Sequence, residues 1–364
     1  MKNRKRVVVK VGTKVITSGD RALDIERVKG LVSQIASIRD KGIDVILITS
    51  GAIGAGLWLL GMKKRPEDLA MLQASAAIGQ NHLMHLYSEF FKNFKTNVGQ
   101  ILLTQEDFND RTRYLNIKHT IEALLEHGAV PIINENDTVA TEEIRCGDND
   151  RLSSLVADLC GAYKLILLTD VDGLLGADGK VINFVSEITH DIAKLGGKSQ
   201  SELGTGGMAT KLEAARAVTR AGIECVIANG KKKDVLPRIL LEGGGFEGTT
   251  FKCGAGRYLA RKRWIAFSST TKGEISVDDG ARSALKDKNK SLLASGILCI
   301  NGYFKPGDAV KITDKNGKEF AKGLSNYSSW DLAKIKGMRT SSFKSVLGRE
   351  GRDEVIHKDN LVLL

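Results

Sequence analysis

The stretch RVVVKVGTK, residues 6–14, decides how the first part of this chain folds. Its apolar residues are β-branched and nearly continuous, which is typical of a strand buried on both faces. Similar runs follow at residues 45–49 (VILIT), 99–103 (GQILL), 129–134 (AVPIIN), 164–169 (KLILLT) and 225–228 (CVIA). Helical patterns, such as residues 24–42 and 66–94, separate these runs. The alternation predicts an α/β fold, an open and mostly parallel sheet with helices on both faces.

The last third of the chain differs in pattern and in charge. Residues 1–254 contain 33 basic and 31 acidic residues, whereas residues 255–364 contain 21 basic and 12 acidic ones. The glycine cluster in LLEGGGFEGTTFKCGAG separates the two compositions and indicates a linker. Beyond it we expect short strands at 262–267, 296–301, 309–314 and 319–324, and helices at 278–289 and 328–337. The sequence therefore predicts two domains, 1–254 and 255–364, of which the second is small and β-rich.

Composition excludes several classes of protein. No apolar run approaches the roughly 20 residues that span a bilayer, so we expect a cytoplasmic protein with no membrane partner. Five cysteines are scattered without a C-x-x-C pair, which argues against a zinc site and a disulfide framework and favours reduced, mostly buried thiols. The sequence contains neither a P-loop motif nor the protein kinase motifs.

Two lysines occupy positions where positive charge has a chemical use. Lys10 ends a buried strand, where a charge is costly unless it is paired. Lys211 follows the glycine-rich helix start LGTGGMATK, whose bare backbone N–H groups and helix dipole suit a phosphate. The plainer alternatives are a solvated lysine at a strand end and a flexible loop with a surface lysine.

A dense group of acids and amides follows the run that ends in PIIN. It comprises Asn134, Glu135, Asn136, Asp137, Asp148, Asn149 and Asp150. Carboxylates this close repel one another unless cations lie among them, and the candidates are Mg²⁺, a substrate ammonium group, and lysines such as Lys10 and Lys211. A solvated acidic loop is the alternative, and the spacing does not match a calcium loop.

Two further strand ends have polar residues. Ser50 and Gly51, in TSGAIGAG, offer a hydroxyl and backbone N–H groups that can receive a carboxylate. Thr169 and Asp170, in LLTD, suit contacts to a nucleotide. Because open parallel sheets bind ligands at the carboxyl ends of their strands, we expect all of these segments to meet in one crevice.

The motifs together carry a resemblance to a known family. KVGTK, TSGAIGAG, TQEDFNDRTRYLN, PIINENDTVAT, GDND, LLTD and GTGGMATKL, in this order, resemble the amino acid kinase family, in particular its members that phosphorylate L-glutamate. Residues from about Lys262 to Lys336 are similar to a PUA domain. LLTD recurs across the family, whereas PIINEND with GDND and a PUA-like tail is much more specific. After LLTD, the segment VDGLLGADGKV lacks the proline-containing loop of several relatives, so nucleotide contacts beyond Asp170 stay open.

The resemblance implies a reaction and a set of roles. The γ-phosphoryl group of ATP passes to the side-chain carboxylate of L-glutamate, with Mg²⁺ bridging the phosphates and no residue assigned as a metal ligand. Lys10 and Lys211 flank the phosphoryl group, and Asp150 holds both ammonium groups. The expected glutamate-binding residues are Ser50, Gly51, Asn134, Asp137, Asp148 and Asn149. The expected ATP-binding residues are Lys10, Thr169, Asp170, Thr205, Gly206, Gly207, Met208, Ala209, Thr210 and Lys211.

The resemblance also bears on partners. It implies a homo-oligomer, a dimer or a tetramer, and feedback inhibition by proline through the glutamate site. For the basic tail two interpretations stay open: contact with the phosphate backbone of RNA, or a solubilising and oligomer-supporting role.

Overall fold

The structure is a computed structural model that describes residues 4–19, 22–139, 149–197, 207–241, 247–253, 265, 271–348 and 352–364. The chain divides into two compact units, Met1–Arg257 and Tyr258–Leu364. The boundary expected at 254/255 lies outside the described residues. Among the described helices, none is both long enough and apolar enough to cross a membrane.

The first unit is built on an eight-stranded sheet with the order β3-β4-β2-β1-β5-β7-β8-β6. Its strands are β1 (Arg6–Val11), β2 (Asp44–Ile48), β3 (Val98–Leu103), β4 (Val130–Glu135), β5 (Lys164–Thr169), β6 (Phe184–Val185), β7 (Glu224–Asn229) and β8 (Thr249–Phe251). The first six strands in this sheet order, β3, β4, β2, β1, β5 and β7, pair in parallel, and β8 pairs with β7 in the antiparallel sense. The mostly parallel α/β fold expected from the sequence is confirmed.

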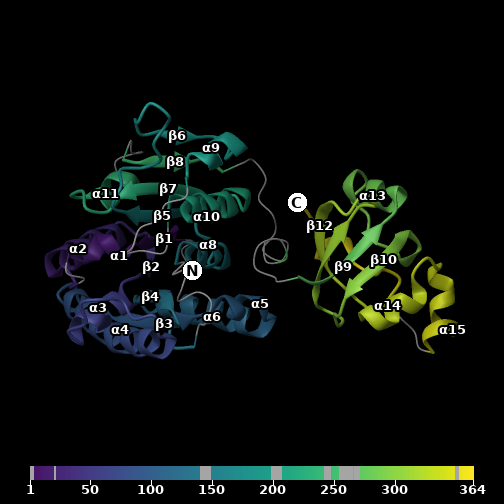
Figure 1. The fold of residues 1–364 in the computed structure, drawn as a ribbon, viewed down its shortest axis with the longest axis horizontal. Helices are drawn as coiled ribbons and strands as arrows, with labels where there is room; N and C mark the ends of the chain where they lie inside the picture. Colours follow the sequence, from purple (N-terminus) through teal and green to yellow (C-terminus); the bar gives the residue numbers. More distant parts are fainter. Residues whose placement is uncertain are drawn as a thin grey trace. The chain divides into compact units, whose positions relative to one another are not determined.

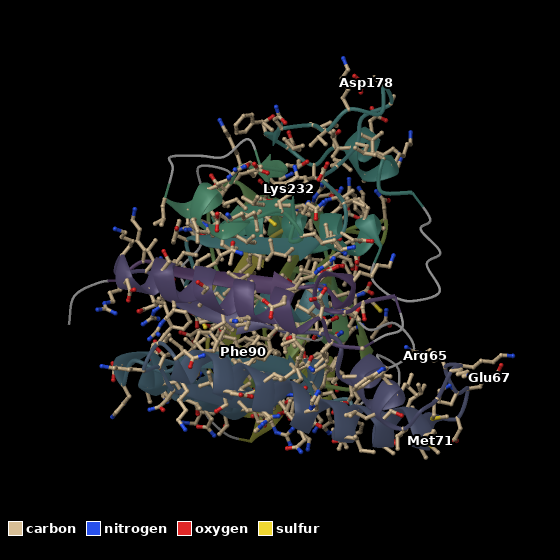
Figure 2. All side chains as sticks on the ribbon, turned by 90° about the vertical axis from the view of Figure 1, so that its left-hand side faces the viewer. Arg65, Glu67, Met71, Phe90, Asp178 and Lys232 are labelled. Carbon is tan, nitrogen blue, oxygen red and sulfur yellow. The ribbon has the colours of Figure 1, made fainter. Side chains whose placement is uncertain are left out.

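Helices cover both faces of this sheet. They are α1 (Thr13–Ile16), α2 (Ile25–Asp40), α3 (Ala52–Leu59), α4 (Leu69–Lys92), α5 (Gln105–Asn109), α6 (Arg111–Glu126), α8 (Asn149–Leu159), α9 (His190–Lys194), α10 (Met208–Arg220) and α11 (Val235–Leu240). In Figure 1, α2 and α11 lie on one side of the stacked strands, and α8 and α10 lie on the other. Figure 2 shows Phe90, from α4, between the α4 layer and α2.

The core follows from the alternation of side chains along the strands. Val7, Val9 and Val11 of β1 belong to the apolar cluster shared with α2, α4 and α11. Successive side chains of a strand point to opposite faces, so Val8 and Lys10 face the other layer. There α8 packs on β1 and β5, and α10 packs on α8 and β7. The pleat alone therefore directs Lys10 toward α8.

The second unit contains a five-stranded sheet with the order β10-β9-β11-β12-β13. Its elements are β9 (Thr271–Val277), α13 (Asp279–Lys286), the 3-10 turn η2 (Ala294–Gly296), β10 (Ile297–Gly302), β11 (Ala309–Thr313), β12 (Glu319–Leu324), α14 (Ser329–Ile335), η3 (Thr340–Ser342), α15 (Phe343–Leu347), η4 (Lys358–Asn360) and β13 (Leu361–Leu363). All pairs are antiparallel except β9 with β11. A separate apolar core lies beneath this sheet. The small β-rich second unit expected from the sequence is confirmed.

Some elements differ from the sequence prediction. The strands β6, β8, β9 and β13 were not expected. The strand expected at 262–267 lies outside the described residues apart from Ile265. Of the four described cysteines, which are all free thiols, Cys160 and Cys225 are buried but Cys253 and Cys299 are exposed.

Candidate active site

The centre of the site is a carboxylate between two ammonium groups. Lys10, at the end of β1, lies with its Nζ 2.8 Å from Asp150 Oδ1, and Lys211 Nζ lies 3.1 Å from Asp150 Oδ2. The three residues are 6%, 5% and 1% exposed. Two cations and one anion leave this buried trio with a net positive charge. Such a group can attract a phosphate, which supplies the missing negative charge.

Asp150 is held in its ionised form. Its burial opposes ionisation, but the attraction of Lys10 and Lys211, together with hydrogen bonds from Lys10 and from the Thr210 hydroxyl, outweighs burial and lowers its pKa to about 2. Thr210 Oγ1 lies 2.8 Å from Asp150 Oδ2 and 2.9 Å from the Gly207 carbonyl. Asp150 is therefore a fixed negative charge at neutral pH, and it orients both ammonium groups.

The start of α10 contributes backbone as well as Lys211. Gly207 is the N-cap residue, in extended backbone, and it has no side chain to cover the first N–H groups of the helix. Met208 and Ala209 form the first turn. These N–H groups and the helix dipole suit an anion, and Lys211 follows one turn later. Thr205 and Gly206 lie outside the described residues.

Two glycines let the backbone approach the site. The Gly12 N–H donates to the Leu168 carbonyl at 3.0 Å, which ties the turn after β1 to β5. A Cβ at Gly12 would lie 3.2 Å from that carbonyl oxygen and 3.9 Å from Lys10 Nζ. Gly51 is the N-cap of α3 with a φ of 99°, a left-handed conformation that favours glycine. Both turns therefore keep side-chain atoms away from the strand ends.

An amide cluster lies beside the lysines. Asn149 Nδ2 lies 2.9 Å from each of three acceptors, the Thr49 carbonyl, Ser50 Oγ and Asn134 Oδ1, which share its two hydrogens. Asn134 Nδ2 in turn donates to Gln80 Oε1 at 2.8 Å. Segments from β2, β4, α4 and α8 thus meet at one place. Asn149 precedes Asp150 in α8, so the amide cluster adjoins the charged trio.

A third group lies at the end of β5. Lys14 Nζ lies 3.3 Å from Asp170 Oδ2, and Thr169 Oγ1 donates to Asp170 Oδ1 at 3.3 Å. Burial opposes ionisation of Asp170, but hydrogen bonds from its own backbone and from Lys14, and the charge of Lys14, outweigh burial and lower its pKa. Further along the chain, Asp172 accepts a hydrogen bond from Asn229 Nδ2 at 2.9 Å.

The structure brings most of the expected site residues together. Lys10, Ser50, Asn134, Asn149, Asp150 and Lys211 are joined through the contacts given above. Asp137 lies half-buried in the turn after β4, and Asp148 lies outside the described residues.

Three contacts in the site were not expected from the sequence. The Thr210 hydroxyl bonds Asp150, Lys14 pairs with Asp170, and Gln80 bonds Asn134. The sequence gives little signal for Gln80, which ends the run SAAIGQ and is followed by the polar residues Asn81 and His82.

Two parts of the chain match known family models. Residues 5–229 match the model of the amino acid kinase family, and residues 273–347 match the model of the PUA domain.

Relatives match the chain over almost its whole length. It is 48% identical to a glutamate 5-kinase from Caldanaerobacter subterraneus subsp. tengcongensis, over 99% of this chain and 98% of the relative. It is 45% identical to a glutamate 5-kinase from Moorella thermoacetica, over 99% of this chain and 96% of the relative.

Solved structures share the fold at low identity. Carbamate kinase from Giardia lamblia bound to AMP-PNP superposes with a TM-score of 0.50 and 19% identity, over 70% of this chain and 100% of that chain. N-acetylglutamate synthase from Neisseria gonorrhoeae superposes with a TM-score of 0.51 and 15% identity, over 69% of this chain and 60% of that chain.

Proposed function

We propose a mechanism for this site from one premise: the chain belongs to the amino acid kinase family. The reaction is the transfer of the γ-phosphoryl group of ATP to the side-chain carboxylate of L-glutamate, the first step of proline biosynthesis. The product is an acyl phosphate. The structural observation that carries the mechanism is Asp150, buried between Lys10 and Lys211 with a net positive charge on the trio.

The chemistry needs positive charge rather than a base. A glutamate carboxylate has a pKa near 4.3, so at neutral pH it is already the nucleophile. The barrier arises from repulsion between this anion and the phosphates, about 4 kcal/mol for a pair of charges 4 Å apart in a partly shielded site. Preorganised cations and backbone dipoles lower such a barrier because they need no rearrangement during the reaction.

Lys10 and Lys211 supply these cations. They flank the phosphoryl group as charge develops on its oxygens, and Asp150 fixes both ammonium groups through its two carboxylate oxygens. Thr210 holds Asp150 from a third direction. Since the carboxylate stays ionised at neutral pH, its role is to orient the lysines and not to move a proton.

The nucleotide lies between the start of α10 and the end of β5. The residues that we assign to ATP are Lys10, Thr169, Asp170, Thr205, Gly206, Gly207, Met208, Ala209, Thr210 and Lys211. When bound, Mg²⁺ would neutralise part of the phosphate charge. No group of three or more His, Cys, Asp or Glu side chains in the described part of the chain is placed to hold a metal ion. The proposal has Mg²⁺ bound through the phosphates and assigns no residue as its ligand.

Glutamate lies against the amide cluster. Ser50, Asn134 and Asn149 are linked to one another there, and Gly51 adds the bare N–H groups of the turn before α3. Asp137 and Asp148 complete the assignment and offer carboxylates to the substrate ammonium group. In this proposal the zwitterion lies beside the lysines, with its side-chain carboxylate toward the γ-phosphate.

Regulation and assembly extend this proposal. Proline, a smaller zwitterion, would compete at the amide cluster, and the chain would act as a homo-oligomer. For the second unit, Tyr303 and Trp330 are 74% and 70% exposed, and Lys334 Nζ lies 5.4 Å from the centre of the Trp330 ring. These side chains offer stacking surfaces within a basic unit, which supports RNA contact; the alternative is a solubilising and oligomer-supporting role.

The decisive experiment traps the product with hydroxylamine. L-glutamate with Mg-ATP should give a hydroxamate, whereas aspartate, N-acetylglutamate, carbamate and UMP, compared by the release of ADP, should turn over far more slowly. Equal or better turnover of N-acetylglutamate or aspartate would overturn the assignment of the substrate.

A further inference from the structure

Gln80 begins a directional chain of amide hydrogen bonds that ends at Asn149. Gln80 lies in α4 and is 8% exposed, Asn134 is 2% exposed, and Asn149 is 7% exposed. Gln80 Oε1 accepts from Asn134 Nδ2 at 2.8 Å, and Asn134 Oδ1 accepts from Asn149 Nδ2 at 2.9 Å. The residues are 54 and 15 positions apart in sequence.

Backbone groups fix the direction of this chain. The Glu135 N–H donates to Asn134 Oδ1 at 2.9 Å, and a backbone N–H can only donate. The Thr49 carbonyl accepts from Asn149 Nδ2 at 2.9 Å, and a carbonyl can only accept. Asn134 must therefore turn its amide nitrogen toward Gln80. Asn149 must likewise turn its oxygen away from the cluster.

The Asn149 oxygen is the end of this chain. Asn149 Oδ1 is buried, and it accepts no hydrogen bond from any described residue. A buried acceptor without a donor is costly, so a donor that arrives with the substrate gains more there than it would in water. Glutamate has one strong donor, its α-ammonium group. Gln80 and Asn134, which precede Asn149 in this series of hydrogen bonds, decide whether the oxygen or the nitrogen of the Asn149 amide meets that group.

Close helix packing explains why Gln80 reaches the cluster. A Cβ at Gly79 would lie 1.8 Å from the Ala52 carbonyl oxygen, and a Cβ at Gly56 would lie 1.8 Å from the Ser75 carbonyl oxygen. The backbones of α3 and α4 therefore touch at two glycines. This contact brings Gln80 next to the first turn of α3, which begins directly after Ser50 and Gly51.

We propose that Gln80 is a positioning residue for substrate recognition: through Asn134 it holds the Asn149 oxygen toward the α-ammonium group of glutamate. The proposal rests on the function proposed above. Without the acceptor at Gln80, the buried Asn134 amide nitrogen has no partner, and the side chain relieves this by rotating away from Asn149. Asn149 then loses one of the three acceptors that fix its orientation.

The test compares Gln80→Met with a matched variant elsewhere. Methionine keeps the length and the helix propensity of glutamine but removes the acceptor. The matched control is Gln34→Met, because Gln34 Oε1 accepts from the Leu236 N–H at 3.0 Å, away from the amide cluster. Gln80→Glu is the conservative variant, since a carboxyl group keeps an acceptor oxygen whether or not it is protonated.

The readouts are the KM values for glutamate and ATP, kcat, and the inhibition constant of glutarate, which is glutamate without its ammonium group. We expect Gln80→Met to raise the KM for glutamate about 10-fold or more, the size of a lost hydrogen bond to a charged group. The KM for ATP, kcat and the inhibition constant of glutarate should change by less than about 3-fold. Gln80→Glu should stay within about 3-fold of the original KM for glutamate.

Each contrary result has a distinct meaning. An equal weakening of glutamate and glutarate by Gln80→Met, or the same loss in Gln80→Glu, would overturn the role of Gln80 in recognising the ammonium group. A KM for glutamate as small in Gln80→Met as in Gln34→Met would overturn it too. If the unaltered chain forms no hydroxamate from glutamate, the function proposed above fails first, and the two failures are thereby distinguishable.

Discussion

Replacing Lys211 by methionine should separate catalysis from stability. The reason lies in the charges of the buried trio Lys10, Asp150 and Lys211. Lys211→Met removes one of two cations, so the Lys10 pair with Asp150 at 2.8 Å stays neutral and the Thr210 hydrogen bond at 2.8 Å stays in place. Lysine and methionine also have similar helix propensities. We expect the free energy of unfolding to change by less than about 1 kcal/mol.

Catalysis should respond differently to the same change. The removed ammonium group is one of the two that we assign to the phosphoryl group, and loss of one such donor costs about 3–4 kcal/mol of transition-state stabilisation, which is about 10²–10³ in kcat. Lys10→Met should lower kcat by a similar factor. The assay is hydroxamate formation at saturating glutamate and Mg-ATP. Lys194→Met is the surface control, since Lys194 is 63% exposed.

Asp150→Asn gives the complementary result. It leaves two buried ammonium groups without a counter-charge, and breaking a buried pair in this way costs about 3–5 kcal/mol of stability. Urea unfolding of Lys211→Met and Asp150→Asn therefore tests whether the net charge of the buried trio determines the loss of stability. Near-normal kcat in Lys211→Met, or a loss of stability as large as that of Asp150→Asn, would refute the reasoning.

Four further predictions follow from the same contacts. Ser50→Ala should raise the KM for glutamate about 10-fold with little change in kcat, because Asn149 loses the Ser50 acceptor. Because the pKa of Asp150 is lowered to about 2, its ionisation adds about 2–3 kcal/mol to the free energy of unfolding at pH values above the unfolded pKa near 4. This stabilisation is lost as the pH falls from about 4 toward about 2. The difference in the free energy of unfolding between the unaltered chain and Asp150→Asn, measured in urea, should therefore shrink over that range. Gly79→Ala should destabilise the fold by about 3 kcal/mol, because its Cβ would clash with the Ala52 carbonyl. Gly30→Ala in α2, where a Cβ meets nothing within 4 Å, should stabilise the fold by about 0.5–1 kcal/mol. Thermal melting measures both changes. A fragment of residues 1–254 should fold and phosphorylate glutamate in the hydroxamate assay, and a folded but inactive fragment would assign part of the site to the second unit.

The central strands could be predicted because they are buried on both faces. β1 and β5 are apolar runs whose composition is set by the helices above and below, so their sequences identify them without knowledge of their neighbours. β6 and β8 have two and three residues, and such short segments show no period. Their strand conformation comes from pairing with each other and with β7. Only the folded chain reveals such strands.

A pairing of lysine with acid could be anticipated from the sequence for a related reason, whereas Asp150 as the residue that holds both lysines was implied only by the family resemblance. A lysine in an otherwise apolar strand needs a partner, and the dense acids after β4 offered one. Gln80 has no comparable local signal. Its role depends on the touching backbones of α3 and α4, which two glycines permit, and on an acceptor that faces a residue 54 positions away. Sequence patterns describe how a segment is buried, but they do not describe which polar atoms meet inside the core.

The first turn of α8 unites the two halves of the reaction. Asn149 orients the amide cluster to which we assign glutamate, and Asp150, the next residue, orients the lysines to which we assign the phosphoryl group. Adjacent Cα atoms lie about 3.8 Å apart across a rigid peptide bond, so the two sets of contacts cannot drift independently. Phosphoryl transfer needs the attacking and leaving oxygens in line, and a small displacement of either is costly. Under these assignments, a single helix start sets the distance between nucleophile and phosphate. Any change that shifts α8 as a whole should alter both glutamate affinity and kcat.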